Sequence, residues 1–266
     1  MMRHVAAHLE MEVATTADMV LAIAVVRSPN LVAESLIVTA DGTRIDPVII
    51  DVAHGGRLHQ LRNLAPAHIV VDYSATIDGV VEPFVVTESE WYQYIRPSRY
   101  CESDRLGPLA RAQFAGLDDR ELLAAVSSWV GWNVSYIPGS SRATDGAVTT
   151  LLARSGVCRD FAHLAVALLR ANGVPARVVT VYAPGLDPMD FHAVVEVCVD
   201  DAWYVVDPTC LAPRSSLVRI ATGADASDTA FLTVVTGSVE LTLMEIGAVV
   251  DPCLPEDDLS ELVRLG

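Results

Sequence analysis

The sequence contains no lysine, and its 18 basic side chains, all of them arginines, are outnumbered by 34 acidic ones. The formal net charge is therefore −16. Nucleic acids and anionic membrane surfaces attract proteins through clusters of positive charge, which this chain is poorly equipped to form. We therefore expect neither nucleic acid nor a membrane among its partners.

Cysteine is also scarce, and five cysteines at wide, irregular spacing do not form the framework of a small disulfide-bonded domain. They include no CxxC pair, so we expect no zinc site, no other metal and no cofactor. The first residues lack the pattern of a signal peptide, and the apolar run MVLAIAVV (19–26) is far shorter than the ~20 residues that span a bilayer. We read this run as a buried strand and expect a cytoplasmic protein.

The hydrophobic pattern changes character along the chain. Residues 1–90 contain short β-branched runs separated by turn residues, which predicts a β-sandwich-like domain or a meander. Residues 91–116 contain two prolines and are interpreted as a connection with at most a short helix. Residues 117–266 contain apolar residues at helical spacing and then further strands, and we expect them to form a second domain. Strands, helices and strands in that order predict the α+β class.

The segment SGVCRDFAHLAVALLR (155–170) places a cysteine directly before a helical run. This thiol can pack in the core, bind a metal, form half of a disulfide or act as a nucleophile. On a wheel of about 100° per residue, Cys158 falls roughly 60° from Phe161 on the apolar side, whereas His163 falls near 200° and is predicted to be solvated or merely supporting. Cys158 also lies in the first turn, where free N–H groups and the helix dipole stabilise a thiolate. On this position alone an inert, buried cysteine is the commoner case, and a nucleophile is the alternative.

A histidine and an aspartate are predicted to meet further along the chain. FHAVVEVCV (191–199) and AWYVVDPT (202–209) have the alternation of two strands joined at Asp200-Asp201. If these two residues form the turn, His192 and Asp207 become diagonal neighbours on one face of the hairpin, within side-chain reach. A carboxylate on one ring nitrogen orients an imidazole and stabilises its protonated form, and such a histidine activates a nearby thiol.

The motifs GVCRDFAHLAVALLRANGVPARVV, HAVVEV and WYVVDPT resemble the core of the transglutaminase-like superfamily, and more narrowly its bacterial cysteine protease branch. The resemblance is densest over residues 136–209. It implies that residues 117–266 are a transglutaminase-like catalytic domain with a papain-like α+β core. In this core Cys158 is the nucleophile, His192 the general base and acid, and Asp207 the residue that orients the histidine. It also implies a peptide or amide substrate and hydrolysis as the reaction. Cross-linking of glutamine to lysine by the same residues, and a catalytically inactive binding scaffold, are the alternatives.

Two positions depart from the pattern of this family. Val194 stands where many relatives have an aromatic residue, often tryptophan, which leaves the shape of the pocket open. Arg159 stands where glutamine is frequent. Neither change removes a reacting atom. The backbone N–H of Cys158 suits an oxyanion hole, and the second donor is expected somewhere in residues 132–150. Trp132 and Tyr136 either line a substrate groove or pack the end of a helix against the core.

Overall fold

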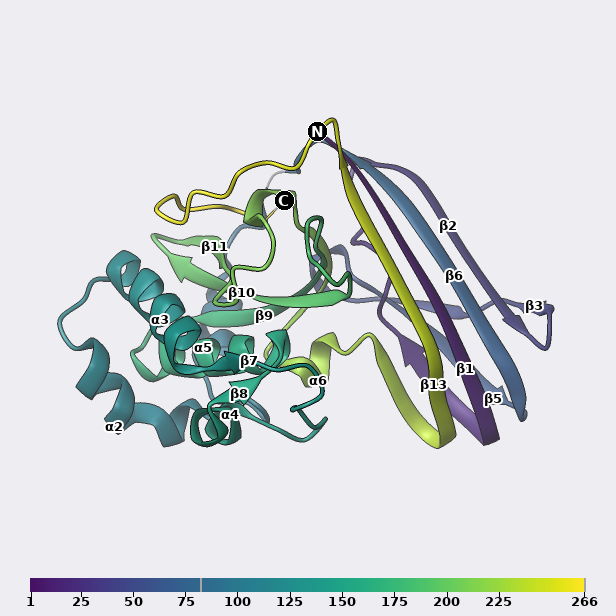
Figure 1. Cartoon of the computed structure of the whole chain (residues 1–266), viewed down its shortest axis with the longest axis horizontal. Helices are drawn as coiled ribbons and strands as arrows, with labels where there is room; N and C mark the ends of the chain where they lie inside the picture. The colour runs from purple at the N-terminus through teal and green to yellow at the C-terminus, as the bar shows by residue number, and fades with distance from the viewer. Residues whose placement is uncertain (82, 266) are drawn as a thin grey trace.

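Two antiparallel sheets, a short parallel pair of strands and a group of helices make up the computed structural model, which describes residues 1–81 and 83–265 (Figure 1). The first sheet has seven strands in the order β3-β2-β6-β1-β5-β4, with β13 on the other edge of β1. Their bounds are β1 (Met2–Leu21), β2 (Leu31–Ala40), β3 (Thr43–Ile45), β4 (Val48–Asp51), β5 (Arg57–Leu64), β6 (Ala67–Asp78) and β13 (Leu232–Asp251).

The first sheet confirms the β-rich character expected for residues 1–90, but its strands form one curved half-barrel and not two packed sheets. The reason is the length of β1: its first part pairs with β6 and its last residues pair with β5, so a single strand belongs to both halves of the curve. Alternate residues of β1, such as Leu9 and Met11, are fully buried. The run 19–26 is buried as expected apart from the half-buried Val20, although only residues 19–21 are strand.

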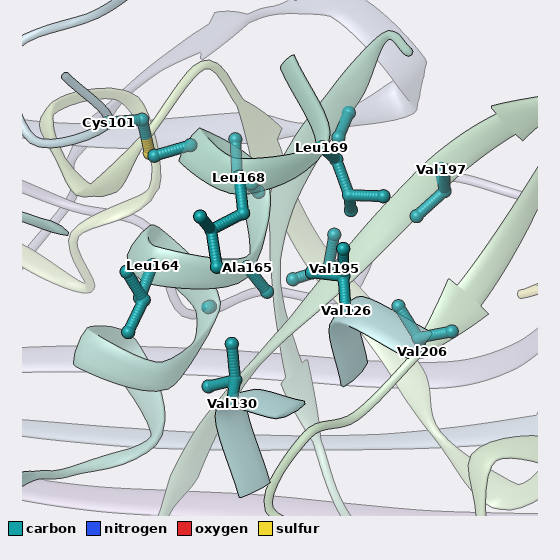
Figure 2. Close-up of a cluster of buried hydrophobic side chains, with 14 of the residues drawn as sticks. Cys101, Val126, Val130, Leu164, Ala165, Leu168, Leu169, Val195, Val197 and Val206 are labelled. Atoms are coloured by element: carbon teal, nitrogen blue, oxygen red, sulfur yellow. The ribbon is translucent and has the colours of Figure 1, made fainter. Parts of the chain in front are cut away.

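The second sheet has four strands in the order β11-β10-β9-β12. Helix α5 packs on this sheet at the centre of the group of helices, which covers one of its faces (Figure 1). Figure 2 shows Leu164, Leu168 and Leu169 of α5 gathered with valines of β10 and α3. The elements of this part are α1 (Glu88–Tyr94), α2 (Ser103–Phe114), α3 (Asp119–Asn133), β7 (Ser135–Tyr136), α4 (Ala147–Ala153), β8 (Ser155–Gly156), α5 (Cys158–Ala171), β9 (Ala176–Tyr182), β10 (Phe191–Val199), β11 (Ala202–Val206), β12 (Val218–Gly223) and α6 (Ala226–Thr229), with 3₁₀ turns at Ala53–Gly55 and Arg214–Ser216.

A buried ion network ties the second sheet to neighbouring segments. Glu196 of β10 accepts hydrogen bonds from Arg177 of β9 at 2.7 Å and from Arg219 of β12 at 2.9 Å, and all three side chains are buried. Arg177 also bonds to Glu90 of α1 at 2.8 Å. Removing one partner of such a network leaves an uncompensated buried charge, so the network holds its strands in one arrangement.

The two sheets share part of their core. Tyr182 and Phe191 of the second sheet belong to the same buried cluster as Leu9 and Met11 of the first. The predicted boundaries at residues 90 and 117 stay a prediction, but β13, from the predicted catalytic range, pairs with β1 in the first sheet. The predicted connection contains α2 and part of α1. Among the described residues, no helix combines the length and the apolar character needed to cross a bilayer.

Candidate active site

Cys158 is the first residue of α5, as expected, and is half-buried. The residues before it hold this position. The Asp160 carboxylate accepts a hydrogen bond from the N–H of Val157 at 2.8 Å. A side chain on Gly156 would place its Cβ 2.6 Å from the Cβ of Asp160, so only glycine allows this close approach. The sequence G-V-C-x-D thus presents the thiol at the start of the helix.

His192 and Asp207 meet across the predicted hairpin. Val199 pairs with Ala202, and Asp200 and Asp201 form the two-residue turn with φ values of 49° and 57°. This turn geometry matches the twist of a hairpin. The resulting register brings Nε2 of His192 within 2.7 Å of Oδ2 of Asp207, and both side chains are buried. The predicted contact between these two residues is therefore present.

Thr209 fixes the other oxygen of the aspartate. Its backbone N–H and its hydroxyl both donate to Oδ1 of Asp207, at 2.9 and 2.6 Å. With both oxygens held, the carboxylate has one orientation toward the imidazole. The D-P-T motif thus contributes the acceptor and, two residues later, the group that aligns it.

The charges of the pair are opposite and mutually stabilising. Burial alone lowers the pKa of His192, but the charge and hydrogen bond of Asp207, with a contribution from Cys158, outweigh it and raise that pKa to about 10. Burial alone raises the pKa of Asp207, but the imidazolium and the Thr209 hydrogen bonds hold it below its ordinary value. The ring is an imidazolium at neutral pH. Since Asp207 uses Nε2, Nδ1 is the atom left for the thiol of Cys158.

Tyr136 brings a hydroxyl to the same place. Strand β7 pairs in parallel with β8, which sets Tyr136 beside Gly156, two residues before Cys158. Its ring packs against Phe161, with centroids 5.9 Å apart. Partial burial, followed by the charge of Cys158, raises the pKa of Tyr136 to about 12, and the phenol also interacts with the backbone N–H of Cys158. Tyr136 therefore carries its proton at neutral pH, next to an N–H at the helix start.

His163 corrects an expectation. The prediction for this residue is a solvated or merely supporting side chain, and the solvated alternative is wrong because the side chain is fully buried. Its Nε2 accepts a hydrogen bond from the N–H of Ala226 at 3.1 Å, and its ring stacks on Tyr100 with centroids 5.4 Å apart. The wheel treated α5 as a helix with one buried face, whereas the segments around Tyr100 and Ala226 cover the face where His163 lies. Burial lowers the pKa of His163 to about 3, so the ring is neutral.

The structure shows the surroundings of Val194 and Arg159, the two residues that depart from the family pattern. Val194 is fully buried among Val179, Val181 and Val205. The guanidinium of Arg159 donates to Oγ of Ser141 at 2.6 Å and to the carbonyl of Arg142 at 2.7 Å, which ties the loop after β7 to the start of α5.

Of the other cysteines, Cys101 and Cys198 are buried, and Cys210 and Cys253 are exposed; none of the five forms a disulfide.

Comparisons with known proteins show the family and the fold of the chain. The model of a family described as the transglutaminase-like superfamily matches residues 109–208. A crystal structure of a candidate cysteine protease from Cytophaga hutchinsonii superimposes with a TM-score of 0.88 at 31% identity, covering 98% of this chain and 96% of that one.

Curated relatives match over shorter stretches. An uncharacterized protein of Mycobacterium leprae is 26% identical over 148 residues, 52% of this chain and 53% of that protein. An uncharacterized protein of Mycobacterium tuberculosis is 37% identical over 83 residues, 31% of this chain and 26% of that protein. The chain thus spans about half or less of the length of these curated relatives.

Proposed function

Because the chain belongs to the transglutaminase-like superfamily, we propose that it is a cysteine-dependent hydrolase of peptides or other amides, with Cys158 as nucleophile, His192 as general base and acid, and Asp207 as the orienting carboxylate. The observation that carries the proposal is the bond between Nε2 of His192 and Asp207, which leaves Nδ1 for a thiol at a helix start. We propose the cytoplasm as its setting, in keeping with five unpaired thiols.

The proposed chemistry begins from a thiolate on Cys158 beside the imidazolium of His192, the pair in which the thiol proton already lies on Nδ1. The thiolate attacks the carbonyl carbon of the amide, and the carbonyl oxygen becomes an oxyanion. Collapse of this intermediate breaks the C–N bond, and Nδ1 returns its proton to the departing amine. The thioester on Cys158 is then attacked by water, which gives its proton to Nδ1, and the acid leaves as the thiol is regenerated.

Tyr136 is proposed as the second donor of the oxyanion hole, with the N–H of Cys158 as the first. Support comes from the protonated phenol that lies beside this N–H. Donors fixed before the reaction stabilise the charge that develops on the oxygen without having to reorganise. Tyr136 lies within the range 132–150, where the sequence predicted a donor.

Water is proposed as the acyl acceptor. The likeness to a candidate cysteine protease over nearly the whole chain supports this choice. The absence of lysine is neutral, because a cross-linking enzyme can use the amines of other proteins.

The test is incubation of the protein with a library of glutamine- and amide-bearing peptides and a millimolar labelled primary amine. We expect free acids and new amino termini as the main products, and a transient acyl mass on Cys158. The matched control is Cys158→Ala, which should give neither. Predominantly amine-labelled product would favour cross-linking, and a chain without product or adduct would be a binding scaffold.

Thiol labelling provides a second test, independent of the substrate. Cys158 should react with iodoacetamide at pH 6 before the other thiols, because burial raises the pKa of Cys101 to about 12 and that of Cys198 to about 11. A Cys210→Ser, Cys253→Ser background removes the two exposed competitors. His192→Ala in this background should lose the early reaction, whereas unchanged labelling would contradict activation by His192.

A further inference from the structure

Asp190 is the residue directly before β10 and lies two residues before His192. Val206 of β11 pairs with Val195 of β10, so the next residue, Asp207, lies past His192 toward the end of β10. Asp207 bonds there to Nε2 of His192. The two carboxylates therefore lie on opposite sides of His192 along the strand.

The charge of Asp190 reaches the proposed reacting groups. It acts on the imidazole of His192 and on the phenol of Tyr136, which itself interacts with Cys158. Asp190 thus lies on the side of His192 where Nδ1 faces the thiol, and Asp207 occupies the Nε2 side. A substrate whose carbonyl carbon lies at Cys158 therefore brings its neighbouring side chains close to the carboxylate of Asp190.

The backbone around Asp190 is held in place. The ring of Phe191 packs against the rings of Tyr182 and Phe231, with centroids 5.4 and 5.1 Å away. The N–H of Phe191 donates to Oδ1 of Asp190 at 2.7 Å and orients the carboxylate. A group that is already oriented loses less conformational freedom when a ligand binds to it.

The carboxylate of Asp190 has no salt-bridge partner. None of the ion pairs in the part of the chain that the structure describes includes it. The segment APGLDPMD (183–190) contains no basic residue. Partial burial raises the pKa of Asp190 above its ordinary value, against the N–H of Phe191 and the charge of His192. A carboxylate that is partly removed from water in this way gains from a cationic partner.

Building on the proposed function, we propose that Asp190 determines specificity by pairing with a cationic side chain, arginine or lysine, next to the scissile amide of a peptide substrate. The guanidinium or ammonium group donates to Oδ2, the oxygen that Phe191 leaves free. The net charge of −16 adds a long-range attraction for basic peptides.

The test compares two peptides that differ in one residue next to the scissile amide. The first has arginine there, and the second has citrulline, which has nearly the same shape without the charge. Asp190→Asn keeps an acceptor for the N–H of Phe191, and it should raise KM for the arginine peptide about tenfold because it removes a charge-assisted hydrogen bond. KM for the citrulline peptide should change little by comparison. Asp190→Glu should keep most of the preference for arginine.

Asp187→Asn is the matched control, because it removes a second exposed carboxylate from the same segment. It should leave both KM values unchanged, and an effect equal to that of Asp190→Asn would overturn the proposal. Equal KM values for the two peptides in the unaltered chain would also overturn it. An equal fall of kcat for both peptides in Asp190→Asn would show that Asp190 acts on His192 and Tyr136 and not on the substrate. These outcomes leave the hydrolase proposal standing.

A binding measurement separates this proposal from the hydrolase proposal. Calorimetry of the Cys158→Ala protein with the arginine peptide should show about tenfold weaker binding when Asp190→Asn is added, and the difference should shrink in high salt. This loss of binding, with no turnover by the unaltered chain, would support the pairing with Asp190 and overturn the hydrolase. Equal binding with and without Asp190→Asn would overturn the pairing.

Discussion

His163 and His192 are both excluded from water, yet the regions around them leave the first ring neutral and give the second a positive charge. His192 faces the Asp207 carboxylate, and its pKa is raised to about 10. His163 faces the N–H of Ala226 and the ring of Tyr100, and burial lowers its pKa to about 3. Burial favours the neutral form in both places, so the difference comes from the group that meets the ring nitrogen.

This difference separates a histidine that moves protons from one that holds the fold together. An imidazolium next to a thiol can exist as a thiolate–imidazolium pair, the reactive state of a cysteine nucleophile. A neutral ring that accepts a backbone hydrogen bond and stacks on a tyrosine contributes packing. The motif C-R-D-F-A-H contains both a cysteine and a histidine, but its histidine belongs to the second kind.

The largest expected effect is on turnover. His192→Ala should lower kcat by about 10³- to 10⁴-fold, because it removes the group that takes and returns the proton. His163→Gln, assayed at a temperature where it stays folded, should keep most of the activity. Steady-state kinetics should compare kcat of His192→Ala with kcat of His163→Gln, with Cys158→Ala as the zero-activity control. An inactive His163→Gln beside an active His192→Ala would reverse the assignment.

The pH dependence of stability should differ in sign between the two regions. The pKa of His192 in the folded chain lies above its unfolded value of about 6.5. Its contribution to the stability of the folded chain is therefore complete below pH 6.5 and is lost as the pH rises toward 10. The pKa of His163 in the folded chain lies below 6.5. Its contribution to the stability of the folded chain is therefore present above pH 6.5 and is lost as the pH falls toward 3.

Denaturant unfolding from pH 4 to pH 10 measures both effects. The free energy of unfolding should depend less on pH above pH 6.5 in His192→Gln and less on pH below pH 6.5 in His163→Gln. Each change should be on the order of a few kcal/mol. A variant that flattens neither side would show that its ring has an ordinary pKa in the folded chain.

The smallest expected effect concerns the tyrosine of each region. Tyr136→Phe should lower kcat about tenfold to a hundredfold with little change in KM, because it removes one donor from the proposed oxyanion hole. Tyr100→Phe, which keeps the ring stacked on His163, should leave kcat unchanged. Equal rates for both variants would assign the second oxyanion donor to another group.

The sequence predicted the parts of the site that depend on local rules. The cysteine at the start of α5 followed from its apolar period, and the contact between His192 and Asp207 followed from strand alternation and a two-residue turn. Tyr136 could be placed only within a range, because a parallel pair of two-residue strands sets its position and leaves no periodic signal.

The environment of His163 depends on segments far away in the sequence, around Tyr100 and Ala226, and a helical wheel contains no information about them. The half-barrel was missed for a similar reason. Its seventh strand, β13, follows β1 by more than 200 residues, and alternation identifies a strand without naming its partner.

The pairing of β1 with β13 also affects how the chain is made. β1 leaves the ribosome well before its partner β13, which is finished only when residue 251 has been added. Until then one edge of β1 exposes backbone N–H and C=O groups that are available to other strands. The segments of the proposed active site end at residue 209, so they are all synthesised while the first sheet still lacks a strand. A chain interrupted between residues 209 and 232 would contain every proposed reacting group beside an unfinished half-barrel.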